Sequence, residues 1–164
     1  PTDERKLTID FSDPYYESDL VIVVRKDSAY AAATSLEDFS GAKITAQLNT
    51  FHYTVIDQIP GVQLQTAMDT FPTMIVALSA GAIDGYVSER PGAESAVATN
   101  PNLTYVSFAD GSGFEADPAD TTIAVGVAKG SELTAKINEA LAAISEDERV
   151  EIMAAALAAQ PSAE

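Results

Sequence analysis

The sequence predicts an α/β fold with largely parallel sheets. Aliphatic and β-branched runs of strand length alternate with segments in which apolar residues recur at helical spacing. Glycine and proline separate these segments, and a stretch rich in Gly, Asp and Pro at residues 110–120 is typical of a loop. A chain of 164 residues can bury one core or two small lobes.

The expected strands are apolar runs bounded by turn residues. They cover residues 20–24, 43–48, 62–66, 83–87, 103–108 and 121–128. The expected helices have capping residues at their starts and glycine or proline near their ends. They cover a short turn at residues 35–38, then residues 50–59, 69–80, 90–99 and 133–144, and a last segment from about residue 147.

The composition excludes several classes of function. The formal net charge is −16, from 25 acidic and 9 basic residues, and this balance repels nucleic acid and anionic lipid. There is no cysteine and only one histidine, His52, which excludes a disulfide scaffold, a thiol nucleophile and a multi-histidine metal site. No apolar run approaches the ~18 residues of a membrane span. No signal-peptide pattern is present, so in an exported protein that segment has been removed or is not part of the given sequence.

The motifs of common enzymes are also absent from the sequence. No Gly-x-Ser-x-Gly elbow accompanies His52, and there is neither a phosphate loop nor a dinucleotide glycine fingerprint. The acidic residues at 146–148 begin a helix and are explained by helix capping. We therefore expect no catalytic residue, no cofactor and no metal.

Several motifs, taken in order, resemble one known family. TDERK at residues 2–6 and IDFSDPYY at residues 9–16 resemble the central signature of type II periplasmic amino-acid-binding proteins. Further matches follow in the order that the family has: SLEDFSG at 35–41, AQLNT at 46–50, ALSAGAIDGY at 77–86 and IAVGVAKG at 123–130. On this resemblance the chain is identified as a member of bacterial solute-binding protein family 3, the amino-acid receptors of ABC transporters.

The resemblance also implies a domain organisation. The family has two α/β lobes joined by two crossing strands, with the ligand in the cleft, and the crossings fall here near residues 17–21 and 117–122. Residues 1–20 and 119–164 then belong to lobe 1, and residues 21–118 form lobe 2. Family members carry roughly 80–100 residues, on ordinary domain sizes, before the TDER signature. We therefore expect a periplasmic-binding-protein-like fold with one complete lobe and one partial lobe, cut off at its N-terminus.

The resemblance assigns ligand-binding roles to Arg5, Asn49 and Thr50. Arg5 would hold the ligand carboxylate, because a guanidinium pairs a carboxylate through two parallel hydrogen bonds. Without the motif, a surface arginine on an acidic protein is the simpler account. Thr50 begins a helix, where its hydroxyl and the free amides can hold an anion or form an ordinary cap. Asn49 stands where the family usually has glycine, and asparagine tolerates positive φ.

Two further residues complete the expected site. Glu89 follows the strand at residues 83–87, at the carboxyl end where α/β sheets place ligands. In the family an acid near this position, usually aspartate, binds the ligand ammonium, and a helix-capping charge is the alternative. Gln47 could reach a ligand side chain, although a polar residue at a strand end explains it equally well. His52 is expected at the surface or behind the residues that touch the ligand.

The resemblance implies a non-enzymatic receptor that captures a free amino acid and delivers it to an ABC-transporter permease. It would work outside the cytoplasm, in the periplasm or as a lipoprotein at the cell surface. The alternatives are an enzyme on the same fold, resembling cyclohexadienyl or arogenate dehydratase, and the ligand-sensing domain of a receptor. Polar, basic and neutral amino acids all remain open as ligands. The partial lobe is expected to self-associate or to be disordered, with weak ligand binding by this chain.

Overall fold

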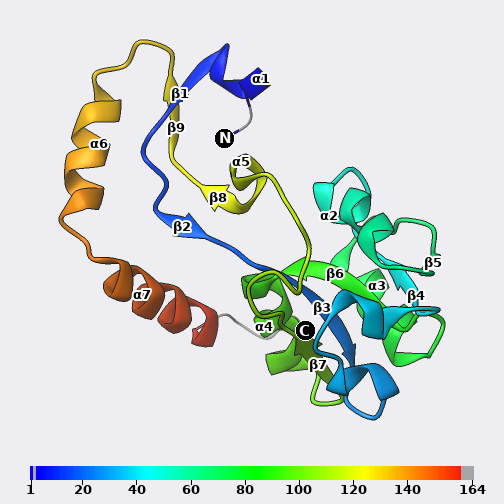
Figure 1. The fold of residues 1–164 in the computed structure, drawn as a ribbon. Coiled ribbons are helices and arrows are strands. Elements are labelled where there is room, and N and C mark those ends of the chain that lie inside the picture. The colour runs from blue at the N-terminus through cyan, green and yellow to red at the C-terminus, as the bar shows by residue number, and fades with distance from the viewer. Residues whose placement is uncertain (2, 160–164) are drawn as a thin grey trace. The chain divides into compact units, whose positions relative to one another are not determined.

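A computed structural model describes residues 1 and 3–159 of the chain, which divides into two compact units (Figure 1). Unit 1 combines residues 1–18 with residues 116–159, and unit 2 is the continuous stretch 19–115. Thr2, which opens the TDER signature, lies outside the described residues, as do residues 160–164. The α/β class is confirmed.

Unit 2 is built on a five-stranded mixed sheet with the order β5-β4-β6-β3-β7. Its strands are β3 (Leu20–Arg25), β4 (Lys43–Thr45), β5 (Gln63–Leu64), β6 (Gly85–Glu89) and β7 (Leu103–Val106). Strand β4 pairs in parallel with β5 and β6, whereas β3 pairs antiparallel with β6 and β7. Four strands therefore run in one direction and only β3 opposes them, which confirms the prediction of a largely parallel sheet.

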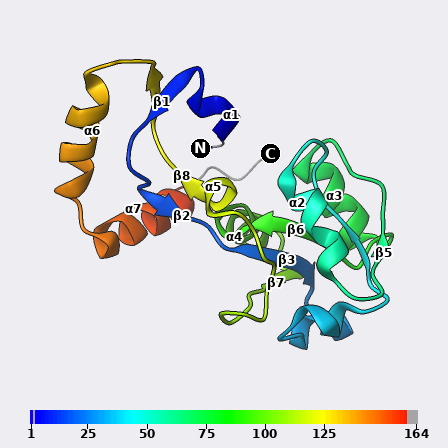
Figure 2. The same cartoon turned by 45° about the horizontal axis from the view of Figure 1, so that its top comes forward.

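The main helices of unit 2 are α3 (Phe71–Ser79) and α4 (Arg90–Thr99), which pack on the sheet (Figure 2). Successive strand residues point to opposite faces, so alternate residues of β3 meet these helices. The resulting core is a single apolar cluster. Its buried members are Val21, Val23, Met74, Leu78, Ile83, Tyr86, Ala93 and Leu103. Since all five residues from Leu20 to Val24 are buried, both faces of β3 are covered, as its unbroken apolar run predicts.

Shorter elements complete unit 2. They are the 3₁₀ helices η1 (Ala29–Ala32), η2 (Leu36–Phe39) and η3 (Val55–Gln58), and the one-turn helix α2 (Phe51–Thr54). Phe39 is fully buried and stacks on Tyr30 with ring centroids 5.5 Å apart. Phe108 meets Phe39 edge-on at 6.2 Å and Phe114 at 6.0 Å. This aromatic chain anchors the loop that follows β7.

Unit 1 contains two short antiparallel ribbons and two longer helices. Its elements are α1 (Asp3–Lys6), β1 (Ile9–Phe11), β2 (Tyr16–Glu17), α5 (Pro118–Thr121), β8 (Thr122–Ile123), β9 (Gly126–Ala128), α6 (Leu133–Ala142) and α7 (Glu146–Ala158). Strand β1 pairs with β9, and β2 pairs with β8. Helix α7 begins with a capping box, in which the Ser145 hydroxyl accepts from the Glu148 amide and the Glu148 carboxylate accepts from the Ser145 amide. None of the helices in the described residues is both long and apolar enough to cross a membrane.

Some boundaries differ from the sequence prediction. The prediction of a single strand at residues 121–128 is wrong. The structure has two short strands there, β8 and β9, which pair with β2 and β1 respectively. Ser12 marks the change of pairing partner: its amide donates to the Val125 carbonyl at 2.9 Å, and its hydroxyl accepts from the Val125 amide at 2.9 Å. The expected loop also contains α5, whose first residue is Pro118 and whose cap is the Asp117 carboxylate. The helix expected from Asp69 starts at Phe71 instead, since Thr70 is the residue that caps it.

Candidate functional site

The candidate site in unit 2 lies where two neighbouring parallel strands end. Strands β4 and β6 pair in parallel with Thr45 opposite Tyr86, so their carboxyl ends lie side by side. The segment after β4 carries Gln47, Asn49 and Thr50, and β6 ends at Glu89. Four of the five predicted site residues therefore share one edge of the sheet, the edge at which open α/β sheets bind ligands.

The turn after β4 has the backbone geometry that the sequence predicts. Asn49 has φ = 61°, the left-handed region in which asparagine can replace glycine. Thr50 then adopts an extended conformation as the N-cap of α2. Its hydroxyl donates to the Gln47 carbonyl at 2.7 Å and makes no capping bond to the first turn. The first amides of a helix lack intrahelical partners, so this turn offers donors to an anion.

Gln47 has a structural role. Its side-chain amide donates to the Asp69 carbonyl at 3.1 Å, and its backbone forms an isolated parallel bridge with Met68. The neighbouring Leu48 amide donates to the Met68 carbonyl at 2.9 Å. These bonds hold the turn after β4 against the segment that leads into α3. Gln47 thus fixes the position of Asn49 and Thr50, whereas direct contact with a ligand stays a prediction.

Glu89 ends β6 and caps α4, with its side chain 34% exposed. Its Oε1 atom lies 3.6 Å from Nε2 of His52, a residue of α2. Glu89 itself makes no side-chain capping bond to α4. A carboxylate that is partly covered by protein and not used for capping can accept hydrogen bonds from a ligand cation.

His52 is buried, so of the two expected places, at the surface or behind the residues that touch the ligand, the surface one does not apply. Its side chain is 11% exposed, and its ring centroid lies 4.4 Å from that of Phe51. Neither ring nitrogen has a hydrogen-bond partner among the described residues. The sequence held a signal for this burial: Val55, Ile56 and Ile59 follow at helical spacing and are also buried. The histidine therefore begins an apolar face.

The residue after Glu89 has a partner of its own. Arg90 donates to one carboxylate oxygen of Asp19 from Nη2 at 2.6 Å and from Nε at 3.2 Å. Its backbone amide donates to the Asp19 carbonyl at 3.0 Å. The hydrogen bonds to Asp19 raise the pKa of the Arg90 guanidinium. Arg90 is therefore directed to Asp19.

Arg5, the fifth predicted residue, lies in unit 1. It is an exposed residue of α1, and its carbonyl accepts from the Thr8 amide at 3.1 Å and the Thr8 hydroxyl at 3.2 Å. These bonds close the last turn of α1 before β1. The backbone that carries Arg5 is thus ordered by its own unit.

Comparison with known proteins identifies the family. The profile of the bacterial extracellular solute-binding proteins, family 3, matches residues 1–156. The chain belongs to this family. Its members are extracellular solute-binding proteins.

Individual relatives carry amino-acid names. The chain is 31% identical over 150 residues to the ABC transporter arginine-binding protein 1 of Escherichia coli. The matched region covers 89% of this chain and 58% of that protein. It is 33% identical over 108 residues to a probable histidine-binding protein of Campylobacter jejuni, covering 65% of this chain and 40% of that one. The chain thus spans about half the length of these relatives. Both are named for binding, and neither is named as an enzyme.

Solved structures agree with the sequence comparison. An amino-acid ABC transporter substrate-binding protein from Streptococcus pneumoniae, solved bound to L-arginine, matches with a TM-score of 0.73 and 27% identity. The match covers 96% of this chain and 64% of that chain. The periplasmic-binding-protein-like fold is therefore confirmed for the two units.

Proposed function

We propose that this protein captures a free L-amino acid outside the cytoplasm and passes it to the permease of an ABC transporter. The observation that carries the proposal is the position of Glu89 and the Thr50 turn at one edge of the unit 2 sheet, in a chain of the solute-binding family. Relatives named for arginine and histidine favour a ligand with a polar or basic side chain. The periplasm and a lipid-anchored position at the cell surface are both compatible with this function.

Each end of an amino acid has a proposed partner. Glu89 binds the ammonium, because it is an anionic acceptor at the end of β6 that helix capping does not use. The carboxylate takes the amides of the Thr50 turn, and the guanidinium of Arg5 in unit 1 pairs with it. Asn49 supplies the positive φ that this turn needs. This division of roles uses the two charges that every free amino acid carries.

Three matched ligands test the division. Titration calorimetry would compare L-arginine with its deaminated and its decarboxylated analogues. Glu89→Gln should weaken L-arginine and the decarboxylated amine by about 2–5 kcal/mol, the usual result of removing one partner of a covered charge pair. The deaminated acid should lose nothing. Arg5→Ala should instead weaken binding of L-arginine and of the deaminated acid, which both keep the carboxylate. It should leave binding of the decarboxylated amine unchanged.

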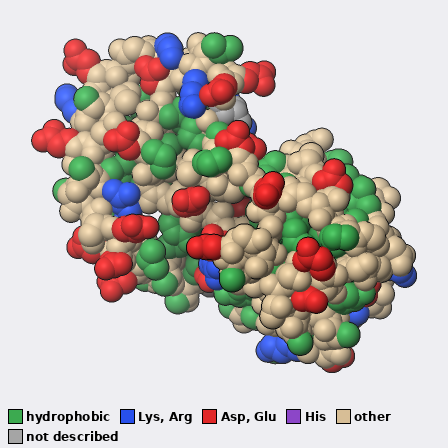
Figure 3. Space-filling view, viewed as in Figure 1, with side chains coloured by type: hydrophobic (Ala, Val, Ile, Leu, Met, Phe, Trp, Pro, Cys, Tyr) green, Lys and Arg blue, Asp and Glu red, His purple; other side chains and the backbone are tan. Residues whose placement is uncertain are grey.

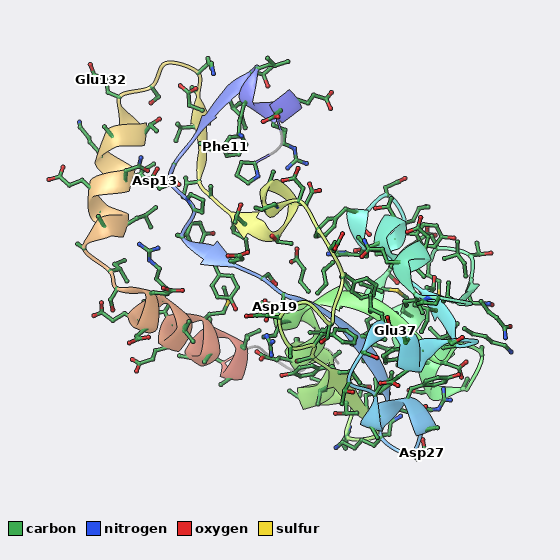
Figure 4. All side chains as sticks on the ribbon, in the orientation of Figure 1. Phe11, Asp13, Asp19, Asp27, Glu37 and Glu132 are labelled. Carbon is green, nitrogen blue, oxygen red and sulfur yellow. The ribbon has the colours of Figure 1, made fainter. Side chains whose placement is uncertain are left out.

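Controls come from the same protein. Glu37→Gln removes an exposed carboxylate of unit 2, and Lys136→Ala removes an exposed cation of unit 1 (Figure 4 labels Glu37). Neither should change any of the three affinities. If Glu89→Gln weakens all three ligands equally, Glu89 is not the ammonium partner. If the unaltered protein binds no amino acid, the proposed function is wrong.

A further inference from the structure

We propose that His52 is a positioning residue for Glu89 and that it links capture of the ligand amine to loss of a proton from the imidazole. The inference rests on the proposed function, because it takes Glu89 as the amine partner. It concerns a residue that the ligand-binding roles above do not use. Its starting point is a buried polar ring without a hydrogen bond.

The geometry of His52 needs an explanation. Buried polar side chains nearly always have a hydrogen-bond partner, yet both ring nitrogens of His52 lack one among the described residues. The nearest charged atom is Oε1 of Glu89, 3.6 Å from Nε2, which is just beyond a normal hydrogen bond. A small movement of the Glu89 side chain converts this contact into a charge-assisted bond when the ring is protonated.

The second observation is the length of the Glu89 side chain. Glutamate has three side-chain torsions, so its carboxylate is less fixed than that of a shorter acid. The buried ring of His52 stands on one side of that carboxylate, and the ring is held by Phe51 at 4.4 Å. The imidazole therefore limits the positions that the Glu89 carboxylate can occupy.

Titratable groups near His52 and Glu89 do not compete with the interaction between these two residues. On β6 and α4, Tyr86 is buried, and burial raises the pKa of its hydroxyl so that it stays neutral. Arg90 is directed to Asp19 at 2.6 Å. Neither group adds a charge that competes for Glu89.

The other titratable groups of α2, η3 and β4 are exposed or bonded elsewhere. On α2, the Tyr53 hydroxyl donates to the Gln65 carbonyl at 2.9 Å. On η3, Asp57 is exposed to solvent. On β4, the Lys43 side chain is exposed, and its amide donates to Asp84. Among the residues that the structure describes, Glu89 is the charged group in contact with the His52 ring.

These contacts determine whether protonation of His52 strengthens or weakens ligand binding. A protonated His52 attracts the Glu89 carboxylate and neutralises it. A ligand ammonium at the same carboxylate competes with that imidazolium and is repelled by it. The amine therefore binds better when His52 is neutral, and binding releases a proton. Affinity should therefore fall as the pH is lowered and the imidazole takes up its proton.

The experiment measures L-arginine affinity by titration calorimetry at several values between pH 5.5 and 8, in buffers of different ionisation enthalpy. For the unaltered protein, we expect affinity to fall about fivefold across this range, the low end of ordinary coupling between two binding events. The buffers should report release of a proton near the acid end. For His52→Gln, which keeps a polar side chain and removes the titration, affinity should be constant across the same range.

A spectroscopic measurement on the unaltered protein tests the inference without the His52→Gln variant. The nitrogen chemical shifts of His52, the only histidine in the chain, report its protonation directly in the unaltered protein. Saturating L-arginine should move the midpoint of that titration to lower pH, whereas the deaminated analogue should leave it unchanged or raise it. A midpoint that L-arginine does not move would overturn the inference.

The outcomes separate the two proposals. If the unaltered protein binds L-arginine with the same affinity at both ends of the pH range, the linkage is wrong and the proposed function stands. The linkage is also wrong if His52→Gln keeps the full pH dependence. If no amino acid binds at any pH, both proposals fail together.

Discussion

Both units contain helices and strands, but their interiors are very different. Every apolar side chain that is buried in the described residues belongs to unit 2, between Leu20 and Val106. In unit 1, the buried side chains among the described residues are those of Ser12 and Ser18. Unit 2 is also a single stretch of chain, whereas unit 1 joins two distant stretches. Burial of apolar surface, which dominates folding free energy, is thus concentrated in one unit.

Unit 1 has apolar side chains but does not enclose them. Leu133, Val150 and Ile152 are 54%, 56% and 60% exposed. A hollow of about 750 Å³ lies within this unit beside β1, and Phe11 forms part of its lining (Figure 4 labels Phe11). Helix and strand formation alone therefore do not guarantee a stable unit, since most helical stability comes from packing of an apolar face.

Charge is distributed more evenly than apolar burial. Acidic side chains lie scattered over the visible face of each unit rather than gathered in one patch (Figure 3). The net charge of −16 favours solubility in general, and it does not explain the difference between the two units.

A leucine-to-alanine substitution in each unit should give the largest difference in lost stability between the two units. Leu78 is fully buried in the unit 2 cluster, so Leu78→Ala should cost about 2–5 kcal/mol through lost burial and a residual cavity. Leu141 of α6 is only partly covered, so Leu141→Ala should cost less than about 1 kcal/mol. Hydrogen exchange read separately for β3 and α6 would measure both. Equal losses would show that unit 1 has a core comparable to that of unit 2.

We propose that the uncovered apolar surface of unit 1 causes self-association of the 164-residue chain. Ile152→Lys should then reduce association, because it places a charge on an exposed apolar position of α7. Val76→Lys, at a 68% exposed position of α3 in unit 2, is the matched control and should leave association unchanged. Sedimentation velocity over a range of concentrations would compare the three proteins. A monomer at all concentrations would contradict the proposal.

The sequence predicts unit 2 more accurately than unit 1 for a physical reason. The predicted bounds of helix α4, residues 90–99, agree with the structure, because Pro91 sits in its first turn and Asn100 ends it. Strand β3 is predictable because its burial on both faces leaves an unbroken aliphatic run. In unit 1, β1 and β2 have three and two residues, too few for a periodic pattern to be recognised.

The candidate site is predictable only in part. The Asn49 turn and the Glu89 strand end follow from local sequence and from the resemblance to the family. The contact between His52 and Glu89 joins residues 37 positions apart, and no local pattern specifies it. Likewise, Gln47 is tied to Asp69, a pairing that depends on the packing of α3.

Asn49 offers a smaller test within unit 2. Its φ of 61° favours glycine, so Asn49→Gly should be close to neutral, and Asn49→Ala should destabilise unit 2 by about 1 kcal/mol. Urea unfolding followed by circular dichroism would measure both. Equal stability of the alanine and glycine variants would mean that the turn does not hold the left-handed conformation in solution.

The smallest expected effect is a pH dependence in unit 1. The Lys129 ammonium, which lies 2.8 Å from Asp10, and the Gly130 amide lower the pKa of the Asp10 carboxyl. A lowered pKa means that this stabilisation is present above the ordinary titration range and is lost as the pH falls through the folded-state value. Protection of the β1 and β9 amides, corrected for intrinsic exchange, should therefore drop in acid. Asp10→Asn should remove that drop, and an unchanged profile would contradict the assignment.

The central claim is that the edge of the unit 2 sheet binds a free amino acid, and a titration observed at single amides tests it most directly. L-arginine would be added up to millimolar concentrations to the ¹⁵N-labelled chain. The account predicts saturable shifts of the Phe51, His52 and Glu89 amides with one common affinity, and much smaller shifts with D-arginine. Shifts confined to unit 1, or no saturable shift at these three amides, would contradict it.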